Sequence, residues 1–149
     1  MLKINGIQMS RARTRDVLLA WVPALVCMAV IYYFSSLNTW TATDGPPAFK
    51  ALRKSAHVIE YSVLAVLIGH ALWTTWLATG SPPARALLAR VWQVGVVLTT
   101  MYAATDEWHQ SFVPRREFHL TDILIDGLSA TAALGIWYIV RARKRNSTS

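Results

Sequence analysis

The sequence predicts an all-α integral membrane protein: a bundle of four transmembrane helices with both termini in the cytoplasm. Hydrophobic residues make up 54% of the 149 residues and charged residues only 15%, whereas soluble domains carry about 25% charged residues. The apolar residues lie in four long blocks, and the basic residues are distributed unevenly around those blocks. We therefore expect a multi-pass protein of the inner (plasma) membrane.

The four apolar blocks are the expected spans. They cover residues 17–37, 54–77, 87–108 and 122–140. Each is long enough to cross about 30 Å of hydrocarbon at about 1.5 Å per residue. Turn-forming residues separate them, namely Gly45-Pro46-Pro47, Gly80-Ser81-Pro82-Pro83 and the stretch around Pro114. The first block is longer than the roughly 7–15 apolar residues of a signal peptide, so we expect it to stay as an anchor.

The membrane domain, residues 17–140, is flanked by a basic segment, 1–16, and a basic tail, 141–149. With the N-terminus inside, ten of the fifteen Lys and Arg residues fall on the cytoplasmic side and seven of the eight acids on the outer side. This asymmetry is typical of a membrane protein whose termini are both inside. It also explains the net charge of +7, so no nucleic-acid partner is needed.

Cysteine chemistry is largely excluded. Cys27 is the single cysteine and lies within the first apolar block. A disulfide within the chain and a metal site built from cysteines are therefore ruled out.

The second block begins with a group of ionisable side chains. Lys54, His57 and Tyr61 are spaced i, i+3, i+7, with Glu60 beside them, so they follow one side of a helix. A purely structural alternative is that Lys54 extends to the membrane interface and that a His57–Glu60 pair tightens helix packing. Further along this block, His70 is expected to be buried and bonded to a neighbouring helix.

The third block ends in a second polar group. Asp106, His109 and Gln110 are spaced i, i+3, i+4, and Glu107 adjoins them. Acids at a helix C-terminus oppose the helix macrodipole, so helix stability does not account for them. A solvated helix end is the alternative, with Arg115 and Arg116 offsetting the charge.

The fourth block begins with a third group. His119, Asp122 and Asp126 are spaced i, i+3, i+7. Asp122 suits the first turn of a helix. Asp126 lies a turn deeper, where a helix start does not need an acid. The small residues that follow Gly127 allow close helix approach.

If the bundle brings these groups together, they form one pocket of mixed charge at the outer leaflet. Arg53, Lys54, Arg115 or Arg116 would bind a phosphate there. The carboxylates would act as acid and base or hold a divalent metal, although their spacing matches no strict metal motif.

These groups together resemble the VanZ-like family. The resemblance is carried by Ser35-Ser36, Lys54-x-x-His57-x-x-Glu60-Tyr61, Thr105-Asp106-Glu107-x-His109-Gln110-x-Phe112-Val113-Pro114-x-Arg116 and Asp122-x-x-x-Asp126. The family pattern often has glycine at the position of Arg115 and asparagine at that of Asp126. The resemblance implies a small integral membrane protein acting at the cell envelope, because the family's namesake is associated with resistance to the glycopeptide teicoplanin.

Three functions remain open from the sequence. In the first, the protein binds or processes a phosphorylated lipid or a glycopeptide-related ligand. The catalytic candidates are Asp106, Glu107, His109, His57 and Glu60, and the substrate-binding candidates are Lys54, Tyr61, Gln110, Arg115, Arg116, Asp122 and Asp126. In the second, the polar residues lock helices together or bind a ligand without catalysis and so alter drug susceptibility. In the third, the chain is a small transporter in which Asp126 relays protons.

Overall fold

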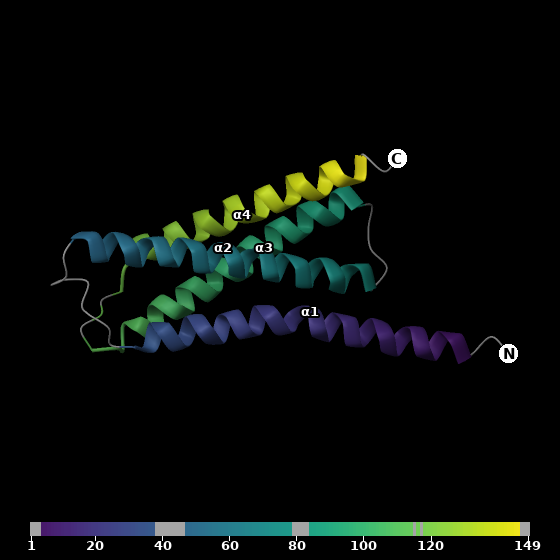
Figure 1. Ribbon diagram of the computed structural model, residues 1–149, viewed down its shortest axis with the longest axis horizontal. Coiled ribbons are helices and arrows are strands. Elements are labelled where there is room, and N and C mark those ends of the chain that lie inside the picture. Colours follow the sequence, from purple (N-terminus) through teal and green to yellow (C-terminus); the bar gives the residue numbers. More distant parts are fainter. Residues whose placement is uncertain (1–3, 38–46, 79–83, 115, 117, 147–149) are drawn as a thin grey trace.

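The described residues form four α-helices that lie along one another (Figure 1). The computed structural model describes residues 4–37, 47–78, 84–114, 116 and 118–146, and within these the side chains of 14–37, 52, 54–78, 86–114, 116 and 118–143. The helices are α1 (Ile4–Ser36), α2 (Pro47–Ala78), α3 (Ala84–Gln110) and α4 (Leu120–Asn146). The described residues contain no β-strand.

Each helix contains a stretch that is long and apolar enough to cross a membrane. These stretches are Thr14–Ser36, Lys54–Ala78, Ala86–Gln110 and Leu120–Arg143. The predicted all-α architecture with four such helices is therefore confirmed. The cytoplasmic location of both termini stays a prediction.

The helices extend beyond the apolar blocks seen in the sequence. α1 begins at Ile4, within the basic segment, and α4 continues to Asn146 in the basic tail. Arg and Lys are good helix formers, so these helices do not end where their hydrophobicity ends. α2 begins at Pro47, where a proline is tolerated because the first helical N–H has no partner within the helix.

α2 is the central helix of the bundle. It contacts α1, α3 and α4, whereas α1 contacts α2 and α3 but not α4. Figure 1 shows the chain termini at one end of the bundle. We call the opposite end, where α1 and α3 finish and α2 and α4 begin, the distal end.

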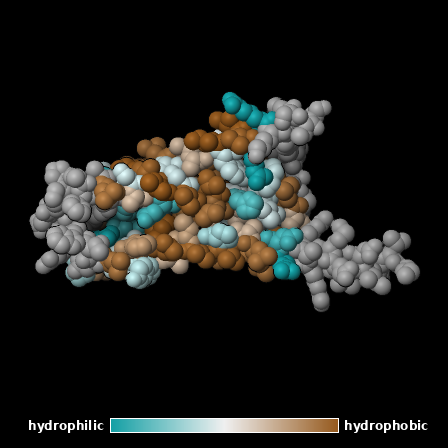
Figure 2. Space-filling view, viewed as in Figure 1, coloured by the Kyte–Doolittle hydropathy of each residue, from teal (hydrophilic) through white to brown (hydrophobic). Residues whose placement is uncertain are grey.

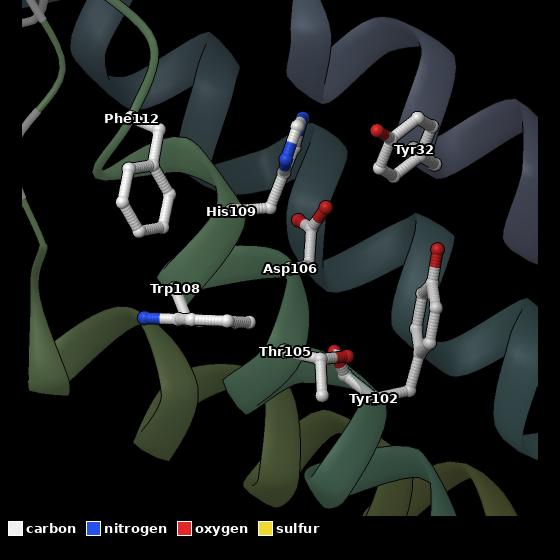
Figure 3. Close-up of a pocket in the computed structure, with 7 residues that line it drawn as sticks. All are labelled: Tyr32, Tyr102, Thr105, Asp106, Trp108, His109 and Phe112. Carbon is white, nitrogen blue, oxygen red and sulfur yellow. Dashed lines mark hydrogen bonds between the residues drawn. The ribbon is translucent and has the colours of Figure 1, made fainter.

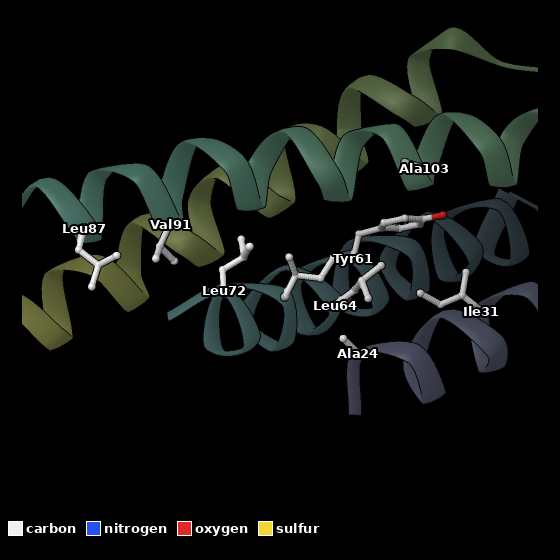
Figure 4. Close-up of a cluster of buried hydrophobic side chains, with 9 residues drawn as sticks. Ala24, Ile31, Tyr61, Leu64, Leu72, Leu87, Val91 and Ala103 are labelled. Carbon is white, nitrogen blue, oxygen red and sulfur yellow. The ribbon is translucent and has the colours of Figure 1, made fainter. Parts of the chain in front are cut away.

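The main hydrophobic core lies along α2. Tyr61, Leu64 and Leu72 face Ile31 of α1 and Val91 of α3 across this core (Figure 4). Most of these side chains are completely enclosed. They hold the three helices in register over much of the span.

A second, tighter contact joins α2, α3 and α4. Leu134 of α4 is fully buried against Ala65 and Ala130. A Cβ added at Gly69 would lie 2.6 Å from a Leu134 methyl, and one added at Gly95 would lie 2.8 Å from the other. A Cβ at either position would force the buried Leu134 side chain to shift, so glycine allows these helices to approach closely, as small residues at membrane-helix contacts often do.

The outer surface of the bundle is mostly apolar. Hydrophobic residues cover much of the middle of the visible face, with hydrophilic residues toward its ends (Figure 2). On α1 the exposed residues include Leu18, Leu25 and Val30. Such a surface fits lipid on all sides of a membrane bundle.

The expectation for His70 is wrong. The residue is exposed on the surface of α2, and its recorded hydrogen bond is made by its backbone oxygen, which accepts from Thr74 Oγ1 at 3.0 Å. The helical period turns this position away from the core residues Leu64, Ile68 and Leu72.

Candidate functional site

Asp106 joins three helices at the distal end. Its Oδ2 accepts hydrogen bonds from Ser35 Oγ of α1 at 2.9 Å and from Tyr61 OH of α2 at 3.1 Å. It also accepts one from Gln110 Nε2, one turn along α3, at 2.8 Å. Asp106 is only 4% exposed, so these bonds form inside the bundle.

Gln110 extends this network toward the chain that follows α3. Its Nε2 also donates to Ser35 Oγ at 3.2 Å, while its Oε1 accepts from Arg116 Nη1 at 2.8 Å. Arg116 Nη2 in turn donates to the backbone oxygen of Leu37 at 3.3 Å. The guanidinium thus ties the segment after α3 to the end of α1. We call Ser35, Tyr61, Asp106, Gln110 and Arg116 the aspartate network.

A second set of contacts joins α2 to α4. His57 Nδ1 lies 3.5 Å from Asp126 Oδ2, and Lys54 Nζ lies 3.8 Å from Asp122 Oδ1. The ring of His57 also stacks on Tyr61 with a centroid separation of 6.0 Å. The α2–α4 contacts therefore adjoin the aspartate network through one aromatic pair.

Glu107 supports the start of α4. Its Oε1 accepts the backbone N–H of His119 at 2.7 Å, immediately before α4 begins at Leu120. The first N–H groups of a helix have no partner within the helix. A buried carboxylate from α3 satisfies one such donor at the entry to α4, because Glu107 is only 3% exposed.

Within the described part of the chain, two buried carboxylate oxygens have no hydrogen-bond partner. They are Asp106 Oδ1 and Asp126 Oδ1. Leaving a buried acceptor unsatisfied costs about 1–3 kcal/mol. The aspartates on α3 and α4 therefore each keep unused hydrogen-bonding capacity inside the bundle.

A pocket of about 390 Å³ lies between α1 and α3 at the distal end. Figure 3 shows Trp108 and Phe112 on one side of it and Tyr32 and Tyr102 on the other, with Asp106 and His109 between them. Trp108 and Phe112 meet edge to face, with ring centroids 5.4 Å apart. The pocket is thus an aromatic site with an acid and an imidazole.

Hydrogen bonding fixes the position of the His109 ring. Its Nε2 lies 3.1 Å from Ser36 Oγ, and the ring lies 4.4 Å from that of Tyr32. The Ser36 hydroxyl donates its single proton to the backbone oxygen of Tyr32 at 2.7 Å. His109 Nε2–H is therefore the donor to Ser36.

The residues expected in one pocket lie in two adjoining groups. The aspartate network is beside the pocket between α1 and α3, whereas Lys54, His57, Asp122 and Asp126 lie between α2 and α4. Glu60 is half-buried on α2 and forms no hydrogen bond or ion pair with another described residue. Arg115 and the side chain of Arg53 lie outside the described residues. The roles assigned to all these residues stay predictions.

The sequence reading missed most of the pocket lining. Tyr32, Tyr102, Thr105, Trp108 and Phe112 line it beside two of the expected residues. A signal was present: Tyr102, Thr105, His109 and Phe112 recur at i, i+3, i+7 and i+10 and so share one helix face. In the described part of the chain, no group of three or more His, Cys, Asp or Glu side chains could hold a metal ion.

The family model described as VanZ/LLP1 matches residues 4–141. This chain belongs to the VanZ/LLP1 family. The match covers the aspartate network, the α2–α4 contacts and the pocket. It includes the first three apolar stretches completely and the fourth except for its last two residues. The chain is thus a multi-pass membrane protein of the VanZ/LLP1 family. No curated protein and no solved structure matches it.

Proposed function

We propose that this VanZ/LLP1-family protein binds a phosphorylated lipid at the distal end of its bundle. The headgroup occupies the pocket between α1 and α3, and the acyl chains lie along the apolar surface of those helices. The observation that carries the proposal is the aromatic pocket next to a buried polar network at the end of a membrane span.

The exposure of the pocket walls supports a lipid as the ligand. Tyr32 is 52% exposed, Trp108 63% and Phe112 69%. All three lie near the distal ends of the apolar stretches, where aromatic rings suit the membrane–water boundary. A ligand with a polar head and an apolar tail can therefore enter this pocket sideways from the bilayer.

The nearby cation supports a phosphate. Arg116 bonds to Gln110, which bonds to Asp106 in the pocket wall. A guanidinium binds phosphate through parallel N–H donors. Arg116 is thus one side chain removed from the pocket.

Binding without catalysis fits the contacts of the acids better than chemistry does. Asp106 accepts hydrogen bonds from Ser35 of α1, Tyr61 of α2 and Gln110 of its own helix, and Glu107 supports the start of α4. Both carboxylates therefore hold the bundle together, which is a structural role rather than a catalytic one. A cell-envelope location and an effect on glycopeptide susceptibility follow from the family resemblance and belong to this proposal.

Native mass spectrometry of gently purified protein tests the proposal. We expect a reproducible phosphorus-containing lipid adduct that is weakened when Phe112 is replaced by alanine. Phe34→Ala is the matched control, because Phe34 is also an exposed aromatic residue near the distal end but does not line the pocket. Absence of any lipid adduct, or equal loss in the two variants, would refute the proposal.

A further inference from the structure

The pocket itself is lined for a cation rather than for a phosphate. Its walls are the rings of Tyr32, Tyr102, Trp108 and Phe112, and its acid is Asp106. The faces of aromatic rings attract cations, Trp most strongly. No Lys or Arg among the described residues lines the pocket.

Asp106 keeps its negative charge available to such a cation. Its hydrogen-bond donors are two hydroxyls and an amide, all of them neutral. These donors bring no opposite charge to the carboxyl group. Among the described Lys and Arg side chains, none forms an ion pair with Asp106. In addition, its Oδ1 is buried and accepts no hydrogen bond.

We propose that the headgroup bound in this pocket carries an alkylammonium group beside its phosphate, as a zwitterionic phospholipid does. This inference rests on the proposed function and specifies its ligand. The ammonium lies among the aromatic rings and close to Asp106, and the phosphate lies outside, on the side of Arg116. The aromatic rings and Asp106 thus complement the positive charge of the headgroup, and Arg116 complements its negative charge.

The size and position of the pocket agree with this ligand. A volume of about 390 Å³ is at the lower end of the roughly 300–1,000 Å³ of drug-sized sites, which suits a headgroup but not a whole lipid. An imidazole, that of His109, also lines the pocket. Its Nε2 faces Ser36 Oγ, so the ring is held by a contact outside the proposed ammonium site.

The experiment compares phosphatidylethanolamine with its N-acetylated form, in which the phosphate and the acyl chains are kept and the ammonium charge is removed. Phosphatidylglycerol with the same chains is the third lipid. Equimolar mixtures are added to the full-length protein, and bound lipid is measured by native mass spectrometry. We expect phosphatidylethanolamine to bind about tenfold more tightly than the other two, a factor that one desolvated cation–π contact provides.

Two variants locate the preference. Asp106→Asn and Trp108→Leu should each reduce it severalfold. If Asp106→Asn folds poorly, Trp108→Leu still tests the preference. Trp108 is 63% exposed, so its replacement should disturb folding little. Phe34→Leu, outside the pocket, should leave the preference unchanged.

The outcomes separate this inference from the proposed function. If the three lipids bind equally and Phe112→Ala weakens all of them, the proposed function stands and the ammonium assignment is wrong. If no lipid binds, the proposed function itself fails. A preference that survives in both Asp106→Asn and Trp108→Leu would place the ammonium elsewhere. Free ethanolamine that displaces the lipid at equal concentration would overturn the assignment to a lipid.

Discussion

Removal of the Tyr61 hydroxyl tests whether the aspartate network holds the bundle together. Tyr61 is fully buried, and its hydroxyl donates to Asp106 Oδ2 at 3.1 Å. Tyr61→Phe deletes this donor and keeps the ring that packs in the core. Side-chain hydrogen bonds between membrane helices contribute about 0.6 kcal/mol on average and about 1.7 kcal/mol at most. We expect Tyr61→Phe to lower the free energy of unfolding by an amount within that range.

Replacing Asp106, the acceptor, should lower the free energy of unfolding more than Tyr61→Phe does. Asp106→Ala deletes all three hydrogen bonds to Oδ2, which at the same values gives a loss of roughly 2–5 kcal/mol. In an Asp106→Ala background, the hydroxyl of Tyr61 has already lost its bond to Asp106, so adding Tyr61→Phe removes no further bond. The two losses should therefore be non-additive by about the value of a single bond.

The assay is the free energy of unfolding in bicelles, measured by steric trapping. Tyr33→Phe is the matched control, since Tyr33 is 61% exposed and its hydroxyl forms no hydrogen bond with any described residue. It should change the free energy by less than about 0.5 kcal/mol. Equal effects of Tyr61→Phe and Tyr33→Phe, or full additivity of Tyr61→Phe with Asp106→Ala, would show that the network does not stabilise the bundle.

Three further predictions concern packing, capping and topology. Gly95→Ala should destabilise the protein by about 1–3 kcal/mol through overpacking against Leu134, as measured by the same unfolding assay, and should be harmless in a Leu134→Ala background; a loss that persists there contradicts the contact. Glu107→Ala should cost about 0.5–2 kcal/mol and speed amide exchange at the start of α4, whereas Glu107→Gln should retain most of the stability; equal effects of the two variants would remove its capping role. In a Cys27→Ser background, a cysteine within residues 147–149 should be shielded from an impermeant thiol reagent in intact cells, and rapid labelling would reverse the predicted orientation.

The fold could be predicted from the sequence because its signals are local. Four apolar blocks of span length specify four helices whatever their packing. The helix ends were less predictable. The apolar span predicted from 17 agrees closely with the stretch from Thr14, but the helix that contains it, α1, begins earlier at Ile4, since basic residues continue a helix as well as apolar ones do. His70 was misjudged because helix periodicity alone does not show which face meets a neighbour.

The candidate site was only partly predictable, for a related reason. Spacing placed Asp106 and Gln110 on one face of α3, and the structure shows them bonded to each other. Spacing could not show that Ser35 and Tyr61 also bond to Asp106, because those contacts depend on how the helices cross. The aromatic lining was missed because aromatic residues near a span end are ordinarily explained by the membrane interface.

Asp106 has two roles that substitution can separate. Its Oδ2 accepts the bonds that hold the helices, while under the ammonium proposal its charge acts on the ligand in the pocket that it lines. In Asp106→Asn an amide oxygen can still accept from Tyr61 and Ser35, so much of the stability should remain while the charge is lost. Tyr61→Phe removes a structural bond and leaves the charge in place. If the ammonium proposal is right, Asp106→Asn should reduce the preference for phosphatidylethanolamine severalfold at a modest cost in stability, and Tyr61→Phe should lower stability with the preference intact. A preference that falls in proportion to stability in both variants would mean that Asp106 acts only through the fold.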